Sequence, residues 1–428
     1  MIEKSLINNS ITNSTYSKGK VDFVDVLLLL LVIFITPETL FFGTNSNRIW
    51  VEVVQKYSSL ILLLILVFKL KKGYVCGKMQ RNILLIFFAI LSVCIVLSGI
   101  YNNNLIIGYG LRILLIGTGF LFVTVFTQQK FMYFFERILY VITIYSLILY
   151  FVRLFSPQLI SFFPAIQNTM SLSFYNAVFC VIPSWGGDST IRLWGPFREP
   201  GVYQMYINLA MLFYIKLNNK LSFKRAAVYI LALFLTYSTT GYIVLLITLL
   251  YFVFENDVAV NKWQKKLLVF LIFLSLIIIS LSTNLFTYDS FVFGKLFDED
   301  SHSSVARFAS IYGNFSIFST SPIFGVGITK LSDLFVNYCN NNYGIANTSN
   351  TATIMVQFAV FGFTYGTLWL LCFLSFFKSF SNKTITAFCI CLAGIISFSG
   401  ENITENILVY ILLGYGLLNY FNKNRIKG

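Results

Sequence analysis

The stretch from Arg192 to Gly201 concentrates polar residues in an otherwise apolar chain, with two arginines, one carboxylate and two prolines. A guanidinium group stays charged, forks onto phosphate oxygens and tolerates partial desolvation. Arg192 and Arg198 are therefore candidates for binding an anion. Glu199, a carboxylate beside them, is a candidate general base.

Glu199 directly precedes Pro200, and proline is favoured as the first residue of a helix. The N-terminus of such a helix would add positive potential beside the two arginines. A simpler interpretation is that Glu199 only caps this helix and pairs with a neighbouring arginine. Trp194 and Tyr203 flank the arginines and could stack on sugar rings, or belong to the aromatic belt found at membrane interfaces.

The composition is that of a polytopic integral membrane protein. Hydrophobic residues make up 57% of the chain, charged residues only 11%, and the mean hydropathy is +0.77, whereas soluble proteins have about 25% charged residues. No segment is polar enough to form a separate soluble domain, so residues 1–428 are expected to be one membrane domain. The net charge of +14 is scattered in short clusters, which indicates membrane topology and not nucleic-acid binding.

Hydropathy predicts an all-α bundle of about twelve transmembrane helices. The apolar spans lie near residues 22–42, 51–70, 82–100, 105–127, 134–156, 200–217, 224–238, 240–255, 266–284, 348–377, 384–399 and 403–421. Most lysines and arginines fall in the segments that an inside N-terminus makes cytoplasmic. Both termini are therefore predicted to be cytoplasmic, with residues 1–21 as an uncleaved tail.

Two long loops, 157–199 and 285–347, are predicted on the outer side, and loops of this length are usually functional. In the second loop, Ser301–Ser304 can cap a helix that carries Arg307 on its polar side and lies along the membrane surface. We expect this helix to end before Ser321–Gly327, where one proline and two glycines favour a re-entrant turn.

Two other residues have open roles. Arg112 lies inside a predicted span, where it could bind a lipid diphosphate or pair with an acidic residue of the bundle. His302, the only histidine, could act as a base because its free pKa is near neutral, or it could be a capping residue.

No metal site and no cofactor are predicted. The seven cysteines form no metal-binding or redox spacing, and Asp298–Asp300 is expected to be a solvated charged turn. Cys180 and Cys339 both fall in predicted outer loops, a location that permits a disulfide without requiring one.

The pattern R-x-x-G-x-F-x-E-P-G at Arg192–Gly201, together with Ala306–Arg307 and Ser321–Gly327, resembles the Wzy-type O-antigen and capsule polymerases of the O-antigen polymerase/ligase superfamily. The layout of spans and loops extends the resemblance over nearly the whole chain. Thr236–Tyr242 resembles a family segment that often reads S-R-T-G, although Thr239 stands where the arginine would be.

The resemblance implies a metal-independent, GT-C-type glycosyltransferase of the bacterial cytoplasmic membrane. Its substrates would be repeat units on undecaprenyl diphosphate, joined at the outer face of the bilayer, and a chain-length regulator and a flippase of the same pathway would be partners. Arg192, Arg198 and Arg307 would contact the diphosphate and the anionic glycan, because cations stabilise the charge on a departing diphosphate.

Two alternatives remain open. An O-antigen ligase usually has a histidine before the span that follows the second loop, and the corresponding stretch, Asn347–Thr351, has none. A transporter or flippase, from a different functional class, would show internal repeats and polar residues near the midplane, but here the polar residues gather at the predicted outer surface.

Overall fold

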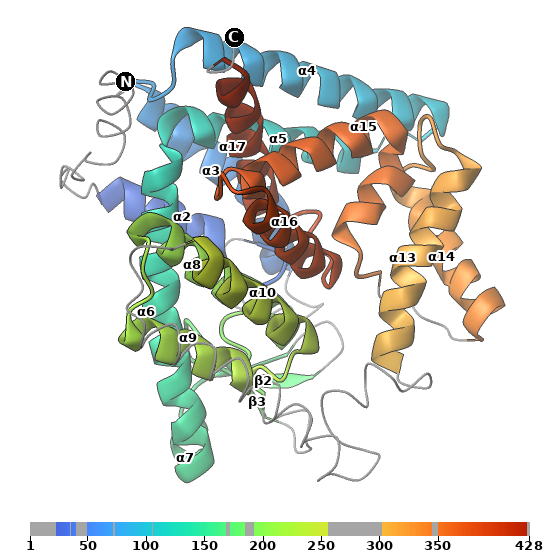
Figure 1. Ribbon diagram of the computed structural model, residues 1–428. Helices are drawn as coiled ribbons and strands as arrows, with labels where there is room; N and C mark the ends of the chain where they lie inside the picture. The colour runs from blue at the N-terminus through green and yellow to red at the C-terminus, as the bar shows by residue number, and fades with distance from the viewer. Residues whose placement is uncertain are drawn as a thin grey trace, which may run out of the picture.

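The computed structural model describes residues 23–34, 36–39, 49–71, 73–104, 106–167, 172–184, 192–255, 302–344 and 350–425. Most of these residues are helical, and the helices pack together as a bundle (Figure 1). The predicted tail, the predicted span near 266–284 and the charged turn at Asp298–Asp300 lie outside the described residues.

The helices before the second predicted loop are α2 (Phe23–Phe34), α3 (Ile49–Leu70), α4 (Lys78–Tyr101), α5 (Ile107–Val125), α6 (Gln128–Phe155), α7 (Pro157–Ile160), α8 (Pro200–Asn218), α9 (Phe223–Leu235) and α10 (Thr239–Glu255). Those that follow are α13 (His302–Thr320), α14 (Ile328–Tyr343), α15 (Thr353–Lys378), α16 (Thr384–Ser399) and α17 (Ile407–Arg425). The predicted division of 224–255 into two helices is confirmed by α9 and α10.

Four of the described helices, α4, α5, α6 and α15, are long and apolar enough to cross a membrane. Several others, including α2, α10 and α16, are apolar but shorter. The helical, membrane character predicted from composition is therefore supported, whereas the count of twelve spans stays a prediction.

Helix α17 lies at the centre of the bundle, packed between α5 and α15 (Figure 1). Its side chains from Leu408 to Leu413 are almost fully buried. The start of α17 at Ile407 therefore marks one end of the bundle core. The residues near Asn422 mark the other end.

Helix α15 is broken, although the hydropathy of residues 348–377 predicts one continuous span there. Gly362 has a φ of 81° and a ψ of −177°, which interrupts the helix. The predicted turn at Ser321–Gly327 packs against this break: the Val326 and Gly327 amides donate to the Ala359 and Val360 carbonyls at 2.9 and 3.1 Å. The turn thus satisfies backbone groups that the break leaves without helical partners.

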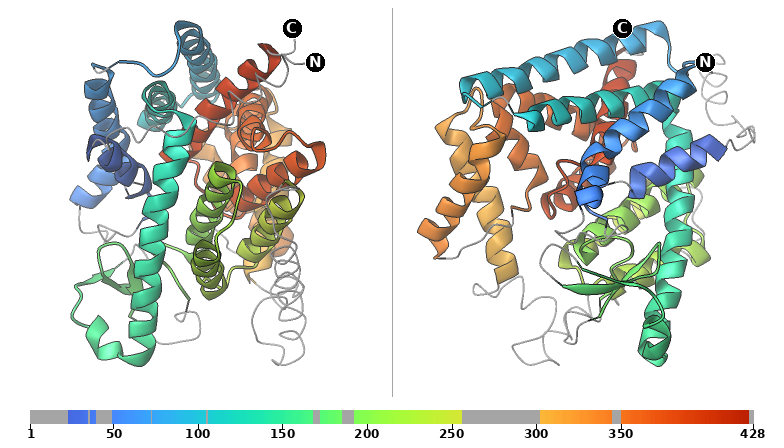
Figure 2. Two further views of the ribbon diagram at one scale, coloured as in Figure 1. Left: turned by 60° about the vertical axis from the view of Figure 1, so that its left-hand side comes forward. Right: turned by 180° about the vertical axis from the view of Figure 1, so that it is seen from behind.

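The first predicted outer loop contains secondary structure of its own. It contains α7 and a three-stranded antiparallel sheet, β1 (Ala165–Gln167), β2 (Ser173–Asn176) and β3 (Val181–Pro183), in the order β1-β2-β3. Phe174 of β2 pairs with Pro183 of β3. The sheet lies beside the end of α6 (Figure 2), where the Tyr145 hydroxyl donates to the Ala177 carbonyl at 2.9 Å.

The predicted helix of the second loop is confirmed as α13, which ends at Thr320 as expected. Its large apolar residues Phe308, Ile311 and Phe315 are exposed, while Ala309, Asn314 and Ile317 are buried. The buried face packs against α14 and α15 (Figure 1): Ile317 joins a hydrophobic cluster with Phe335 of α14, and Phe318 packs against Phe358 of α15.

Candidate functional site

Three backbone hydrogen bonds hold the Arg192–Gly201 segment in place. The Leu193 amide donates to the Leu235 carbonyl at the end of α9, and the Val181 amide of β3 donates to the Gly195 carbonyl, both at 2.7 Å. The Arg198 amide donates to the Glu38 carbonyl, also at 2.7 Å. Contacts from three separate parts of the chain therefore fix the segment as a rigid loop.

The segment ends at the start of α8, as its Glu-Pro sequence predicts. Pro200 is the first helical residue, and Glu199 occupies the N-cap with extended backbone angles. Its side chain makes no capping hydrogen bond and is exposed. The position of Glu199 at the cap is confirmed, but its carboxylate remains available at the surface.

Arg192 and Arg198 are half-buried and bind backbone carbonyls. Arg192 donates to the Thr236 and Tyr237 carbonyls at 2.8 and 3.2 Å. Arg198 donates through Nη2 to the Asn402 carbonyl at 3.2 Å. Each guanidinium is thus oriented by neutral acceptors. These hydrogen bonds do not neutralise its positive charge.

Arg198 retains an unused donor. Its Nε is buried and has no hydrogen-bond partner among the described residues. Because buried polar atoms are almost always hydrogen-bonded, this nitrogen is a candidate contact for a bound anion.

Arg307 reaches the same place from α13, more than 100 residues later in the chain. Its Nη1 donates to the Thr239 hydroxyl at 3.3 Å, at the start of α10. The Thr236–Gly241 hairpin therefore contacts two arginines, since its carbonyls hold Arg192 and its hydroxyl holds Arg307. This hairpin takes part in the site even though Thr239 replaces the arginine usual in the resembling family.

Glu401 is the residue of this cluster that the sequence analysis missed. Hydropathy predicts the last span over residues 403–421, but α17 begins only at Ile407. Glu401 instead lies in the preceding turn and is only 7% exposed. A Cβ on Gly201 would overlap its carboxylate, so the missing side chain of Gly201 makes room for Glu401 at the N-terminus of α8.

The charges of the cluster perturb one another. Burial and the neighbouring Glu199 charge raise the pKa of Glu401 to about 8, although Arg198, Arg307 and Arg192 oppose the rise. Burial also lowers the pKa of Arg192, against the attraction of Glu401 and Glu199. Three arginines and two carboxylates thus interact within one site, which we call the arginine cluster: Arg192, Arg198, Arg307, Glu199 and Glu401.

A buried polar network supports the arginine cluster from one side. Glu38 is 2% exposed and accepts a 2.8 Å hydrogen bond from the Asn406 amide, which also donates to the Tyr206 hydroxyl at 2.8 Å. Because the Glu38 carbonyl also holds the Arg198 amide, this network positions the arginine-bearing loop.

The two aromatic candidates occupy different environments. Tyr203 is fully buried; its hydroxyl donates to Thr143 at 3.2 Å, and its ring packs against Phe197 and Gly195. Tyr203 therefore packs under the Arg192–Gly201 loop, where its ring is not accessible to a ligand. Trp194 is half-buried and packs edge-on against Phe174 at 5.2 Å.

Arg112 lies outside the arginine cluster. It is 7% exposed and donates to the Thr404 carbonyl and, at 2.8 Å, to the Tyr410 hydroxyl. Glu405 lies 3.8 Å away, whereas Asp25 pairs with Lys69 and Lys130. Of the two interpretations, the contacts favour a role inside the bundle.

His302 begins α13, five residues before Arg307, and the position of its side chain lies outside the described part of the structure. Cys180 and Cys339 are both free thiols and belong to separate hydrophobic clusters. Within the described ranges, no group of three His, Cys, Asp or Glu residues could hold a metal ion.

Residues 226–374 match the model of a protein family described as O-antigen ligase. The matched region includes Arg307, Thr239 and the Ser321–Gly327 turn. The match supports the O-antigen polymerase/ligase superfamily without distinguishing a polymerase from a ligase, and with the apolar helices it indicates a membrane protein. No curated protein matches the chain. No solved structure matches it either.

Proposed function

We propose that this protein is a membrane glycosyltransferase that joins undecaprenyl-diphosphate-linked repeat units into O-antigen or capsular polysaccharide at the outer face of the bacterial cytoplasmic membrane. The observation that carries the proposal is the convergence of Arg192, Arg198 and Arg307 beside the N-terminus of α8. Such a concentration of cations suits a diphosphate, and the family match makes a lipid-linked glycan its natural carrier.

In the proposed reaction, a hydroxyl oxygen of one glycan attacks the anomeric carbon of the other. A new carbon–oxygen bond forms as the bond to the diphosphate breaks, and the diphosphate leaves with the bonding electron pair. Arg198 and Arg307 stabilise the negative charge that grows on the leaving group, an effect that is typically large in a preorganised site. Arg192, held by two carbonyls, completes the positive surface around the diphosphate.

Glu199 takes the proton from the attacking hydroxyl. Its exposed carboxylate lies at the N-cap of α8 beside the arginines, where a substrate hydroxyl can reach it. Glu401 is too buried for this contact, and its protonation state instead controls the net charge of the arginine cluster. While Glu401 is protonated and neutral, the three arginines attract an anion more strongly. Both carboxylates therefore have a role, one in proton transfer and one in anion affinity.

A ligase, which transfers a finished glycan to a different acceptor, is the second candidate, because the matching family is described as O-antigen ligase. The stretch before α15, where ligases usually have a histidine, makes structural contacts at its described end. Asn350 and Asn314 donate to each other at 2.8 and 3.0 Å, and the Thr351 amide donates to Ser310 at 3.0 Å. These contacts fix the described end of the stretch on α13, and we propose the arginine cluster as the reactive site for either activity.

Purified protein in lipid nanodiscs, incubated with a lipid-linked repeat unit, tests the proposal. A ladder of polymer products supports a polymerase. A single transfer that requires a separate lipid acceptor would replace the polymerase with a ligase, and no glycosidic bond formation under either condition would overturn both assignments.

A further inference from the structure

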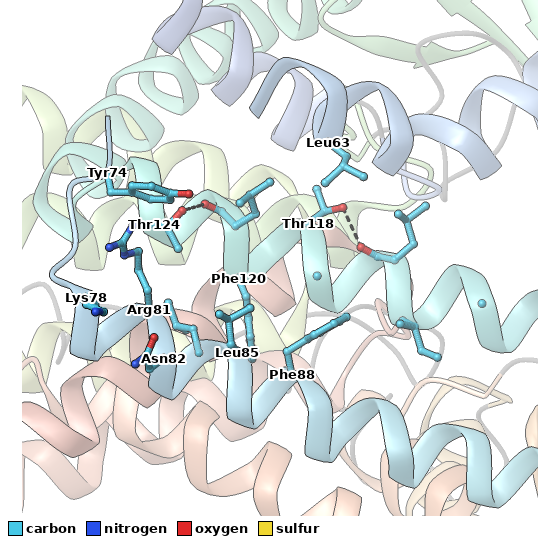
Figure 3. Close-up of a pocket in the computed structure, with 16 residues that line it drawn as sticks. Leu63, Tyr74, Lys78, Arg81, Asn82, Leu85, Phe88, Thr118, Phe120 and Thr124 are labelled. Carbon is cyan, nitrogen blue, oxygen red and sulfur yellow. Dashed lines mark hydrogen bonds between the residues drawn. The ribbon is translucent and has the colours of Figure 1, made fainter. Parts of the chain in front are cut away.

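A long apolar groove runs between α4 and α5, away from the arginine cluster. It has a volume of about 670 Å³ and a mostly apolar wall, contributed by side chains such as Leu85, Phe88 and Ile113. Ligand pockets typically measure about 300–1,000 Å³, so the groove can accept one lipid-sized chain. Figure 3 shows the lining residues of α3, α4 and α5 around it.

The hydroxyl hydrogens that face the groove are already used within α5. Thr118, near the middle, and Thr124, beside Tyr74 (Figure 3), donate to the Leu114 and Leu121 carbonyls, each at 2.7 Å. Near the start of α5, a Cβ on Gly110 would meet nothing within 4 Å. The groove is therefore a hydrocarbon-lined channel with free space at that end.

The opposite end of the groove is cationic. Lys78 and Arg81 line it there with Tyr74 (Figure 3), and the Arg81 guanidinium lies 4.0 Å from the centre of the Tyr74 ring. Neither cation has an ion pair among the residues that the structure describes, and the buried Nε of Arg81 has no hydrogen-bond partner there. Two uncompensated positive charges thus stand where an apolar channel opens.

This cationic end and the arginine cluster lie at opposite ends of α17. Gln80, between Lys78 and Arg81, donates to Asn422 near the end of α17 at 3.4 Å, whereas Arg198 binds Asn402 before its start. A helix of 19 residues is about 28 Å long. The groove therefore opens toward the face of the protein that the charge pattern predicts to be cytoplasmic.

We infer that this groove is a binding site for an anionic glycerophospholipid of the cytoplasmic leaflet, with its acyl chain along α5 and its phosphate between Lys78 and Arg81. An apolar channel with a cationic mouth matches an amphiphile with an anionic head, and basic pockets between membrane helices on the cytoplasmic side bind such headgroups. The substrate's lipid diphosphate is handled at the other end of α17, so the two sites take different lipids.

Native mass spectrometry of the purified protein with phosphatidylglycerol or phosphatidylcholine tests this site. The wild type is expected to bind phosphatidylglycerol more tightly. The double variant Lys78→Gln/Arg81→Gln is expected to lose affinity for it by about 25-fold, since each basic side chain contributes about fivefold. Lys71→Gln removes an exposed cation outside the groove and serves as the matched control.

A second pair of variants tests the channel itself. Gly110→Leu fills the free space near the start of α5 and is expected to reduce binding of both phospholipids, whereas Gly110→Ala is expected to retain it. Unchanged preference in the double variant, unchanged binding in Gly110→Leu, displacement of the lipid by glycerol phosphate alone, or tighter binding of undecaprenyl phosphate would each overturn the inference. Size-exclusion profiles identify any variant that fails to fold; the double variant is then replaced by Lys78→Gln and Arg81→Gln separately, and Gly110→Leu by Gly110→Val.

Discussion

The two ends of α17 present positive charge in different ways. The N-terminal end of α17, near Ile407, faces three half-buried arginines: Arg192, Arg198 and Arg307. Carbonyl or hydroxyl acceptors orient these arginines, which also interact with two carboxylates. At the other end, Lys78 is exposed and Arg81 only stacks on a tyrosine ring.

The difference indicates two uses of the same charge. Cations that are fixed in place before a ligand arrives can stabilise a transition state, because no reorganisation is needed as charge develops. Cations at the mouth of an apolar channel can bind a lipid headgroup without being fixed in place beforehand. We therefore expect substitutions at the first end to affect turnover, and substitutions at the second end to affect only lipid binding.

The largest effect is expected for Glu199→Gln, which removes the proposed base and keeps its size. A general base contributes about 10²- to 10⁴-fold, so kcat should fall by this factor, while KM should change by no more than the roughly fivefold expected from one charge in the cluster. Steady-state kinetics with a lipid-linked repeat unit measures both constants. Glu405→Gln, at an exposed carboxylate, is the matched control, and an equal loss there would remove the special role of Glu199.

Gly201→Ala should disturb the arginine cluster through packing alone. Its new Cβ would overlap the Glu401 carboxylate, and overpacking of this kind costs about 1–3 kcal/mol. Thermal unfolding should therefore occur at a lower temperature than in the wild type. Adding Glu401→Ala should restore most of the loss; a double variant that is less stable than Gly201→Ala would contradict the contact.

A smaller effect is expected from pH. The pKa of Glu401 is raised to about 8, so the residue is mostly protonated at neutral pH and gains a negative charge as the pH rises through 8. That charge partly cancels the arginines, and KM should rise by roughly fivefold, equivalent to about 1 kcal/mol of lost attraction. Glu401→Gln should flatten the KM profile between pH 7 and 9, whereas a slope equal to that of the wild type would exclude Glu401 as its source.

The smallest effect is expected for Lys78→Gln/Arg81→Gln on glycosyl transfer. Because these residues lie at the far end of α17, transfer by the purified variant should stay within about twofold of wild type, the scale of an ordinary surface substitution. A large loss of kcat in this variant, measured in detergent without added phospholipid, would contradict the separate functions proposed for the two ends of α17.

Most of the local features could be predicted from the sequence, because they depend on local residue patterns. Pro200 after Glu199 predicts the start of α8, and the glycines and proline of Ser321–Gly327 predict the end of α13. The break at Gly362 could not be predicted, because it depends on a distant turn that supplies the missing hydrogen bonds. Hydropathy treats that apolar segment as continuous.

The site was predicted only in part. The polar density of Arg192–Gly201 and the family resemblance pointed to Arg192, Arg198 and Arg307 together as anion contacts. Glu401 was missed because its burial arises from Gly201, a residue 200 positions earlier, and no local pattern reveals that contact. Tyr203 shows the opposite error: its type and position suggest sugar stacking, but the packing of Gly195 and Phe197 buries its ring.

The central claim is that two distant segments form one anion site, and a double-mutant cycle tests it most directly. kcat/KM for glycosyl transfer is measured for wild type, Arg198→Ala, Arg307→Ala and the double variant, with Lys330→Ala as the exposed control from the same predicted loop. Each single substitution is expected to reduce kcat/KM by about 10²- to 10³-fold. The double variant should be little worse than either, because residues that act as a unit are non-additive; losses that multiply, or near wild-type activity in either single variant, would contradict a shared site.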